Sequence, residues 1–221
     1  HELKTPLTAM KGYSETLLSV KLTHEQQEKA LNYINRESGR LSRLSEKMME
    51  LTKMYEPECR IVLREISLEA LFEGVRQNVS HRLRENGMTL LVEDGYQGRT
   101  MLLDLDLMTS FLINLINNSI MASEPGSRIY MGAGERSLWV RDEGCGIPPD
   151  EIGKVRRAFY RVDKSRSRKS GNMGLGLALC TEILALHKSR LEFESEPGQG
   201  TTAGFLLWEE GKEAQHEEIH S

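Results

Sequence analysis

Apolar residues recur at intervals of seven between Ile34 and Tyr55, in a stretch that no proline interrupts. This spacing predicts a helix that carries an apolar seam of period 3.5. Thr23 and Gln26 precede it with the spacing of a capping box, which predicts where the helix begins. The seam residues are Ile34, Leu41, Leu44, Met48, Leu51 and Tyr55.

A first helix is expected before it, ending near Val20, in which Leu3, Met10 and Leu17 also repeat by sevens. Two short amphipathic helices bury little apolar surface by themselves. Two solutions are open: the hairpin dimerises into a four-helix bundle, or it packs on the second domain of its own chain. Because the seam covers most of both helices, the sequence favours the dimer.

The pattern changes at a linker in residues 55–60, after which strands and helices alternate. Hairpin-like strand pairs near the end of the chain predict a mixed sheet with helices stacked on one face. The predicted units are a helical hairpin at 1–56, an α/β domain at 57–210 and a polar tail at 211–221. Strands are expected at 60–66, 88–93, 100–105, 128–134, 138–144, 191–196 and 201–208, and helices at 67–85, 106–123 and 174–187.

Bulk properties exclude several classes of protein. The net charge of −4 argues against a nucleic-acid-binding surface. No run of about 18 apolar residues occurs, so a membrane anchor is expected only in segments outside this sequence. Cys59, Cys145 and Cys180 lie far apart with no C-x-x-C spacing. They argue against a disulfide framework or a zinc site and favour reduced cysteines in the cytosol.

Asn114 and Asn118 lie four residues apart in a predicted helix, so their amides share one face. Amide oxygens are hard, neutral ligands that suit Mg²⁺ when nucleotide phosphates supply most of the negative charge. The alternative is an ordinary polar helix face.

The segment DEGCGIP follows an apolar strand and begins with Asp142. Its carboxylate can accept a hydrogen bond from an amino group such as that of adenine. Gly144 and Gly146 allow a tight turn and the close approach of a ligand. The alternative is a simple turn with a solvated aspartate.

Gly174 and Gly176 lead into another predicted helix, whose bare N–H groups would suit a phosphate. Before them, residues 154–169 carry eight Lys or Arg and one acid. A run of like charge usually marks a solvated face. Between two glycine motifs, and in an acidic chain, we favour a lid over a nucleotide rather than a nucleic-acid patch.

The order of these motifs, followed by GQGTT at 198–202, resembles the GHKL nucleotide-binding fold of gyrases, heat-shock chaperones, sensor histidine kinases and mismatch-repair ATPases. They look like the N, G1, F, G2 and G3 boxes of the histidine kinases, and FYRVDKSRSR is similar to the lid of that family. HELKTPLT at the start of the sequence resembles the H box. The resemblance implies a dimeric hairpin followed by a Bergerat-type α/β sandwich.

The resemblance also implies the chemistry. His1 would take the γ-phosphoryl group of ATP and pass it to an aspartate of a response-regulator receiver domain. Glu2 would orient the imidazole and act as base, and Thr5 would place the water for phosphatase activity. A neutral imidazole held by a carboxylate is a suitable nucleophile near pH 7. The chain would then be the cytoplasmic portion of a membrane-anchored bacterial sensor.

For the nucleotide, the resemblance implies Mg²⁺ bound by Asn118 and phosphates beside Asn114, with Asp142 reading adenine. The other implied binding residues are Gly144, Gly146, Tyr160, Arg161, Arg166, Gly174, Leu175, Gly176 and Thr201. Two positions depart from the family pattern: Met121 replaces a common Lys or Arg, and Asn172 replaces a common glycine. They motivate an alternative, a degenerate dimeric scaffold or phosphatase with weak ATP use. A GHKL ATPase that works as a conformational clamp is less favoured, because the H box is present.

Overall fold

The computed structural model describes residues 3–56, 60–162 and 174–206. His1, Glu2, Cys59, Arg166 and Asn172 therefore lie outside the described residues. Within those ranges, no helix combines the length and the apolar character that a membrane crossing requires.

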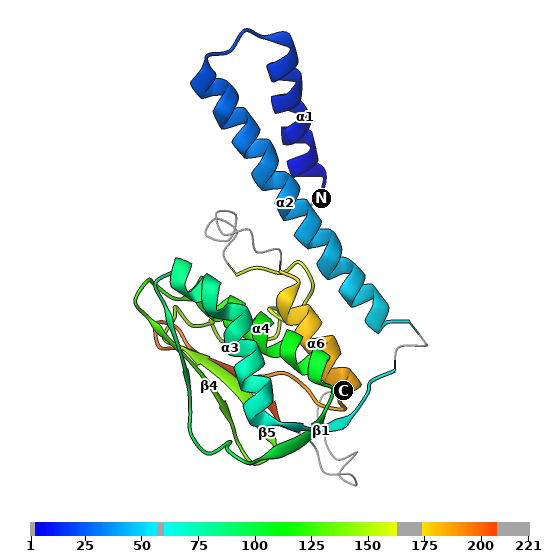
Figure 1. The fold of residues 1–221 in the computed structure, drawn as a ribbon, viewed down its shortest axis with the longest axis vertical. Coiled ribbons are helices and arrows are strands. Elements are labelled where there is room, and N and C mark those ends of the chain that lie inside the picture. The colour runs from blue at the N-terminus through cyan, green and yellow to red at the C-terminus, as the bar shows by residue number, and fades with distance from the viewer. Residues whose placement is uncertain (1–2, 57–59, 163–173, 207–221) are drawn as a thin grey trace.

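Two antiparallel helices open the chain, α1 (Lys4–Ser19) and α2 (His24–Met54) (Figure 1). The predicted capping box is confirmed: Gln26 N–H donates to Thr23 Oγ1, and Thr23 N–H donates to Gln26 Oε1 at 3.0 Å. The rings of Tyr13 and Tyr33 meet across the hairpin with their centroids 4.5 Å apart.

The rest of the chain forms a mixed sheet, as predicted. Strands β1 (Arg64–Ser67) and β3 (Thr100–Leu103) pair separately as an antiparallel ribbon. The main sheet has the order β2-β4-β5-β7-β6, in which only β2 and β4 are parallel. Its strands are β2 (Thr89–Val92), β4 (Arg128–Ala133), β5 (Ser137–Asp142), β6 (Glu192–Glu196) and β7 (Gly200–Leu206).

Three helices cover one face of this sheet: α3 (Leu68–Glu85), α4 (Leu105–Ala122) and α6 (Gly176–Leu186) (Figure 1). Their apolar residues and the inward residues of the strands form one core. Phe111 of α4 and Phe205 of β7 meet edge to face with centroids 5.5 Å apart, so the middle helix is anchored directly to the sheet.

Most predicted boundaries agree with the structure within two residues. The strand expected at 60–66 begins only at Arg64. Upstream of it the Val62 N–H donates to Asp104 Oδ2 at 2.9 Å instead of to a strand. The helix expected from Gly174 begins at Gly176, because Gly174 has a φ of +70°, which is not helical.

The C-terminal half of α2 packs on the α/β unit of the same chain. Leu44 and Leu51 contact it, and Tyr55 OH donates to Glu182 Oε1 at 2.6 Å. This part of the seam therefore follows the alternative in which the hairpin packs on its own chain. Several other large apolar side chains of the hairpin remain exposed: Leu3, Leu7, Tyr13, Leu31, Met48 and Met49.

Candidate functional site

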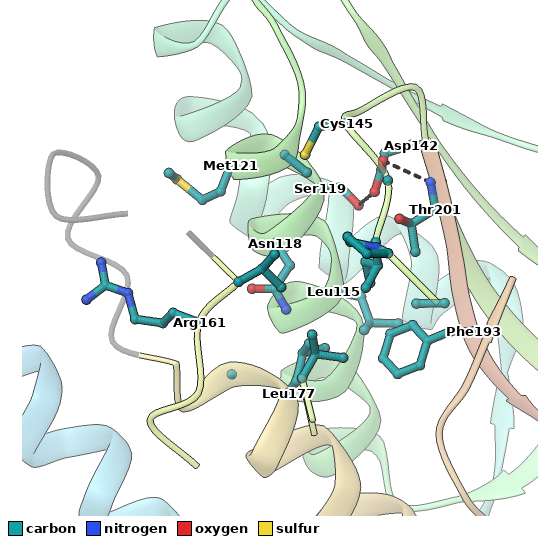
Figure 2. A pocket seen from close by; sticks show the side chains of 18 of the residues that line it. Leu115, Asn118, Ser119, Met121, Asp142, Cys145, Arg161, Leu177, Phe193 and Thr201 are labelled. Carbon is teal, nitrogen blue, oxygen red and sulfur yellow. Dashed lines mark hydrogen bonds between the residues drawn. The ribbon is translucent and has the colours of Figure 1, made fainter. Parts of the chain in front are cut away.

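A pocket of about 480 Å³ lies between α4, the segment after β5 and the start of α6 (Figure 2). It brings together residues that lie far apart in the sequence. Eight of the predicted binding residues line it: Asn118, Asp142, Gly146, Tyr160, Arg161, Gly174, Gly176 and Thr201. Thr5, by contrast, is exposed on the first turn of α1 and lines no part of this pocket.

Asp142 ends strand β5 and is held by three donors, of which Ser119 and Thr201 are shown in Figure 2. The Gly144 and Thr201 N–H groups donate to its Oδ1 at 3.0 and 3.2 Å, and Ser119 Oγ donates to its Oδ2 at 2.8 Å. Burial raises the pKa of this carboxyl, while the three hydrogen bonds act in the opposite direction. The result is a fixed acceptor in the wall of the pocket.

At two positions beside Asp142, neighbouring backbone lies so close that a side chain would not fit and glycine is needed. A Cβ on Gly146, which has a φ of +68°, would lie 2.0 Å from the Glu196 carbonyl oxygen. A Cβ on Gly144 would lie 2.7 Å from the Ala122 carbonyl oxygen. The sequence predicted a tight turn and the close approach of a ligand at these positions. The structure shows neighbouring segments of the same chain in close approach.

The two asparagine amides converge beside the first turn of α6. A Cβ on Gly176 would lie 3.4 Å from Asn114 Oδ1 and 3.7 Å from Asn118 Oδ1, so a side chain there would fill the space beside both amides. Leu175, the N-cap residue, provides no side-chain cap for this helix. The arrangement places the Asn114 oxygen, both polar atoms of the Asn118 amide and an uncapped, positive helix end beside one small volume.

These residues fit a magnesium–nucleotide pair better than a metal alone. Among residues 3–56, 60–162 and 174–206, no three His, Cys, Asp or Glu side chains cluster as metal ligands. A cation beside Asn118 would therefore depend on phosphate oxygens for most of its ligands.

Phe159, in the basic segment 154–169, is hydrogen-bonded to the glycine-rich segment before α6. The Phe159 N–H donates to the Gly174 carbonyl at 2.8 Å, and Tyr160 OH donates to the Glu151 carboxylate. That hydrogen bond lowers the pKa of Glu151 and raises the pKa of Tyr160. Arg161 follows and lines the pocket (Figure 2).

Three predicted binding residues do not line the pocket. Asn114 is buried behind it, Gly144 supports Asp142, and Leu175 packs against α2. Sequence reasoning also missed residues that do line it. Ser119 follows Asn118 directly in the sequence, so it could have been proposed as a hydrogen-bond donor on the same helix. The apolar residues that line the pocket could not be distinguished in the sequence from residues of the hydrophobic core. The lining residues include Leu115, Ile147, Val155, Leu177 and Phe193.

Two family models match the chain in succession. The His Kinase A (phospho-acceptor) domain matches residues 1–56, and the histidine kinase-, DNA gyrase B- and HSP90-like ATPase matches residues 103–211. The chain is 31% identical over 209 residues to Sensor protein SrrB of Staphylococcus aureus (strain MRSA252) and 30% identical over 207 residues to Sensor histidine kinase YclK of Bacillus subtilis (strain 168). Each alignment covers 91% of this chain, which spans 35% and 43% of these relatives.

Solved structures share the fold. The histidine kinase ThkA in complex with the response regulator protein TrrA matches with a TM-score of 0.73 at 20% identity, over 94% of this chain and 58% of that one. The Acinetobacter baumannii histidine kinase AdeS matches with a TM-score of 0.66 at 22% identity, over 94% of this chain and 97% of that one.

The pocket joins a buried acceptor, the Asn118 amide and an uncapped helix end, and it lies in the region that the ATPase model matches. The helical hairpin before it is the region that the phosphoacceptor model matches. The chain belongs to the sensor histidine kinases.

Proposed function

We propose that this chain is the core of a two-component sensor kinase, which phosphorylates itself from ATP and passes the phosphoryl group to a response regulator. The observation that carries the proposal is the convergence of Asp142, Asn118 and the start of α6 on one pocket. The two ends of that pocket differ chemically, as the two ends of ATP do.

Adenine fits the end of the pocket at Asp142. The ionised carboxylate accepts a hydrogen bond from the exocyclic amino group, while Ile147, Val155 and Phe193 provide apolar contact for the purine ring. The phosphates then extend toward the N-terminus of α6 and Arg161, where positive charge is available.

Asn118 would hold Mg²⁺ together with phosphate oxygens, and Asn114 would support it from behind. When bound, Mg²⁺ neutralises the charge that develops on the phosphates during transfer. Arg161, and Arg166 by its resemblance to the family's lid, would supply further positive charge. Tyr160, Leu175 and Thr201 would shape the site around the nucleotide.

The resemblance to the H box supports His1 as the phosphoacceptor. A nitrogen of its neutral imidazole attacks the γ-phosphorus, the bond to the bridging oxygen breaks, and ADP leaves. Glu2 takes the proton that the imidazole loses. The phosphoryl group then passes to an aspartate carboxylate of the receiver domain, which releases the histidine. Thr5, four residues after His1 in the sequence, would orient the water that hydrolyses the resulting acyl phosphate.

The exposed apolar side chains of α1 and α2 support a homodimer built from the hairpin. We assign residues 1–56 to dimerisation and phosphotransfer, 57–210 to ATP binding and 211–221 to the tail. Any membrane anchor belongs to segments outside this sequence.

Incubation with γ-labelled ATP and Mg²⁺ tests the proposal. The chain should acquire an acid-labile, alkali-stable label that His1→Gln lacks, with both proteins folded by circular dichroism. Equal labelling of the two proteins would contradict it.

The presence of Met121 in the pocket favours one second candidate, a dimeric scaffold or phosphatase with weak ATP use. Calorimetry with Mg²⁺ and a non-hydrolysable ATP analogue discriminates between the two. Micromolar binding excludes the scaffold, and no detectable binding excludes the kinase.

A further inference from the structure

A chain of hydrogen bonds runs from the hairpin to Asn114, which is buried beside the candidate nucleotide site. It begins at Glu50 on α2, whose Oε1 accepts from Ser110 Oγ of α4 at 2.7 Å. The other carboxylate oxygen of Glu50 accepts from Lys47 Nζ at 2.9 Å. Both oxygens are thus engaged, and the carboxylate has a defined orientation toward α4.

Ser110 is in turn hydrogen-bonded to Asn114. Asn114 Nδ2 donates to the Ser110 carbonyl at 2.8 Å and lies 3.4 Å from Ser110 Oγ. A carbonyl can only accept, so the amide nitrogen must face Ser110. Because Ser110 Oγ donates its proton to Glu50, its lone pairs face Asn114 and reinforce the same arrangement.

The amide oxygen of Asn114 must consequently point the other way. It lies 3.4 Å from the position of a Cβ on Gly176, at the start of α6. Asn114 is 5% exposed, so its side chain has little freedom to choose another partner. The bond to the Ser110 carbonyl lies within α4 and does not depend on the hairpin. Glu50 is coupled to this oxygen through Ser110 Oγ, whose 3.4 Å hydrogen bond with Asn114 Nδ2 adds to the hold on the amide.

We propose that Glu50 is a positioning residue for the nucleotide site, acting through Ser110 on Asn114. The inference rests on the proposed binding of ATP in this pocket. Because Glu50 and Ser110 belong to different units, the chain of hydrogen bonds is complete only while α2 is docked. Nucleotide affinity and docking of the hairpin are then linked, and each strengthens the other by the same factor.

Titration calorimetry on the whole chain tests this with two ligands, AMPPNP with Mg²⁺ and adenosine. Glu50→Ala and Ser110→Ala should each weaken AMPPNP binding by about three- to tenfold, the range expected for one lost hydrogen bond. The double variant should bind as the single variants do, because both break one path. Adenosine affinity should not change, since adenosine reaches Asp142 but carries no phosphate.

Two further variants separate positioning from structure. Glu50→Gln keeps an acceptor for Ser110 and should restore most of the AMPPNP affinity. Tyr55→Phe removes a docking hydrogen bond between α2 and Glu182 that lies on no path to Asn114, so it measures the effect of weaker docking alone, which should be smaller than that of Glu50→Ala. Circular dichroism confirms that each variant is folded, and Glu50→Gln provides a conservative comparison if Ser110→Ala does not fold.

The outcomes distinguish the inference from the function on which it rests. If the unmodified chain binds neither ligand, the proposed function and this inference both fail. If the unmodified chain binds AMPPNP and Glu50→Ala binds it equally well, only the inference is overturned. The same holds if the loss of AMPPNP affinity in the double variant is the product of the losses in the two single variants.

Discussion

Leu44 of α2 and Leu175 of the glycine-rich segment lie in one hydrophobic cluster and are 2% and 3% exposed. One belongs to the hairpin and the other is the N-cap residue of α6. An apolar contact between the two units thus ends at the segment that we assign to the nucleotide phosphates.

Leu44→Ala should destabilise the chain by removing this contact. Truncation of a buried leucine costs about 2–5 kcal/mol, and because the two units can relax toward each other we expect the lower part of that range. Chemical denaturation measures the change in the free energy of unfolding. Leu18→Ala is the matched control, since Leu18 is 88% exposed and its truncation should change stability by less than about 0.5 kcal/mol.

Met121→Lys should strengthen binding of nucleoside triphosphates. Met121 lines the pocket on the same helix as Asn118, and a lysine there would add a cation within reach of the phosphates (Figure 2). We expect a gain of about fivefold for AMPPNP, about the value of one surface-accessible ion pair, and none for adenosine. Equal gains for both ligands would show that the lysine does not act on the phosphates.

His187 should make the chain less stable in mild acid. Its Nδ1–H donates to the Ile183 carbonyl at 2.8 Å and its Nε2 accepts the Asp104 N–H at 3.1 Å, so both ring nitrogens are used in the neutral form. Burial lowers the pKa of His187, partly offset by the bond to Ile183 and the charge of Asp104. The unfolded chain therefore binds this proton more tightly than the folded chain.

It follows that the contribution of His187 to stability is fully present above the ordinary pKa of about 6.5 and is lost as the pH falls toward the lowered value. Denaturation of the wild type and of His187→Gln, followed from pH 8 to pH 5, measures this. The variant should show a smaller decline, and the difference between the two proteins at pH 8 reports the packing and hydrogen bonds of the neutral ring. Identical slopes in the two proteins would refute the assignment.

Cys145 should be the thiol that reports nucleotide binding. It is exposed and lines the pocket, whereas Cys180 is fully buried and burial raises its pKa strongly. In a Cys59→Ser background, iodoacetamide should label Cys145 and spare Cys180. Saturating AMPPNP should slow this reaction several-fold, as peptide mass spectrometry would measure. Asp142→Asn, in which the proposed adenine contact is weakened, should lose the protection.

The positions of the polar site residues were largely predictable from the sequence. Asn114 and Asn118 share a face because a helix fixes side chains four residues apart, and Asp142 ends β5 where the alternating pattern stops. Both placements depend only on the geometry of a single helix or strand, so tertiary packing does not change them. That Asn114 is buried while Asn118 lines the pocket was not predictable, because it depends on how closely α6 approaches α4 in space.

The seam of α2 shows where local reasoning ends. Its period predicted a helix correctly, but Leu41, Leu44 and Leu51 look the same in the sequence as the exposed Met48. What distinguishes them is a surface more than a hundred residues away, on α6. A heptad specifies that an apolar stripe will be covered, and does not specify by which partner.

The last consequence concerns β6, which forms an edge of the main sheet. Its exposed side chains are those of Glu192, Glu194 and Glu196, while Phe193 and Ser195 alternate inward. Three like charges along an edge oppose pairing with a strand from another copy. In a dimer, where tethering keeps two such units at high local concentration, this charge pattern would keep each catalytic unit from aggregating with its neighbour.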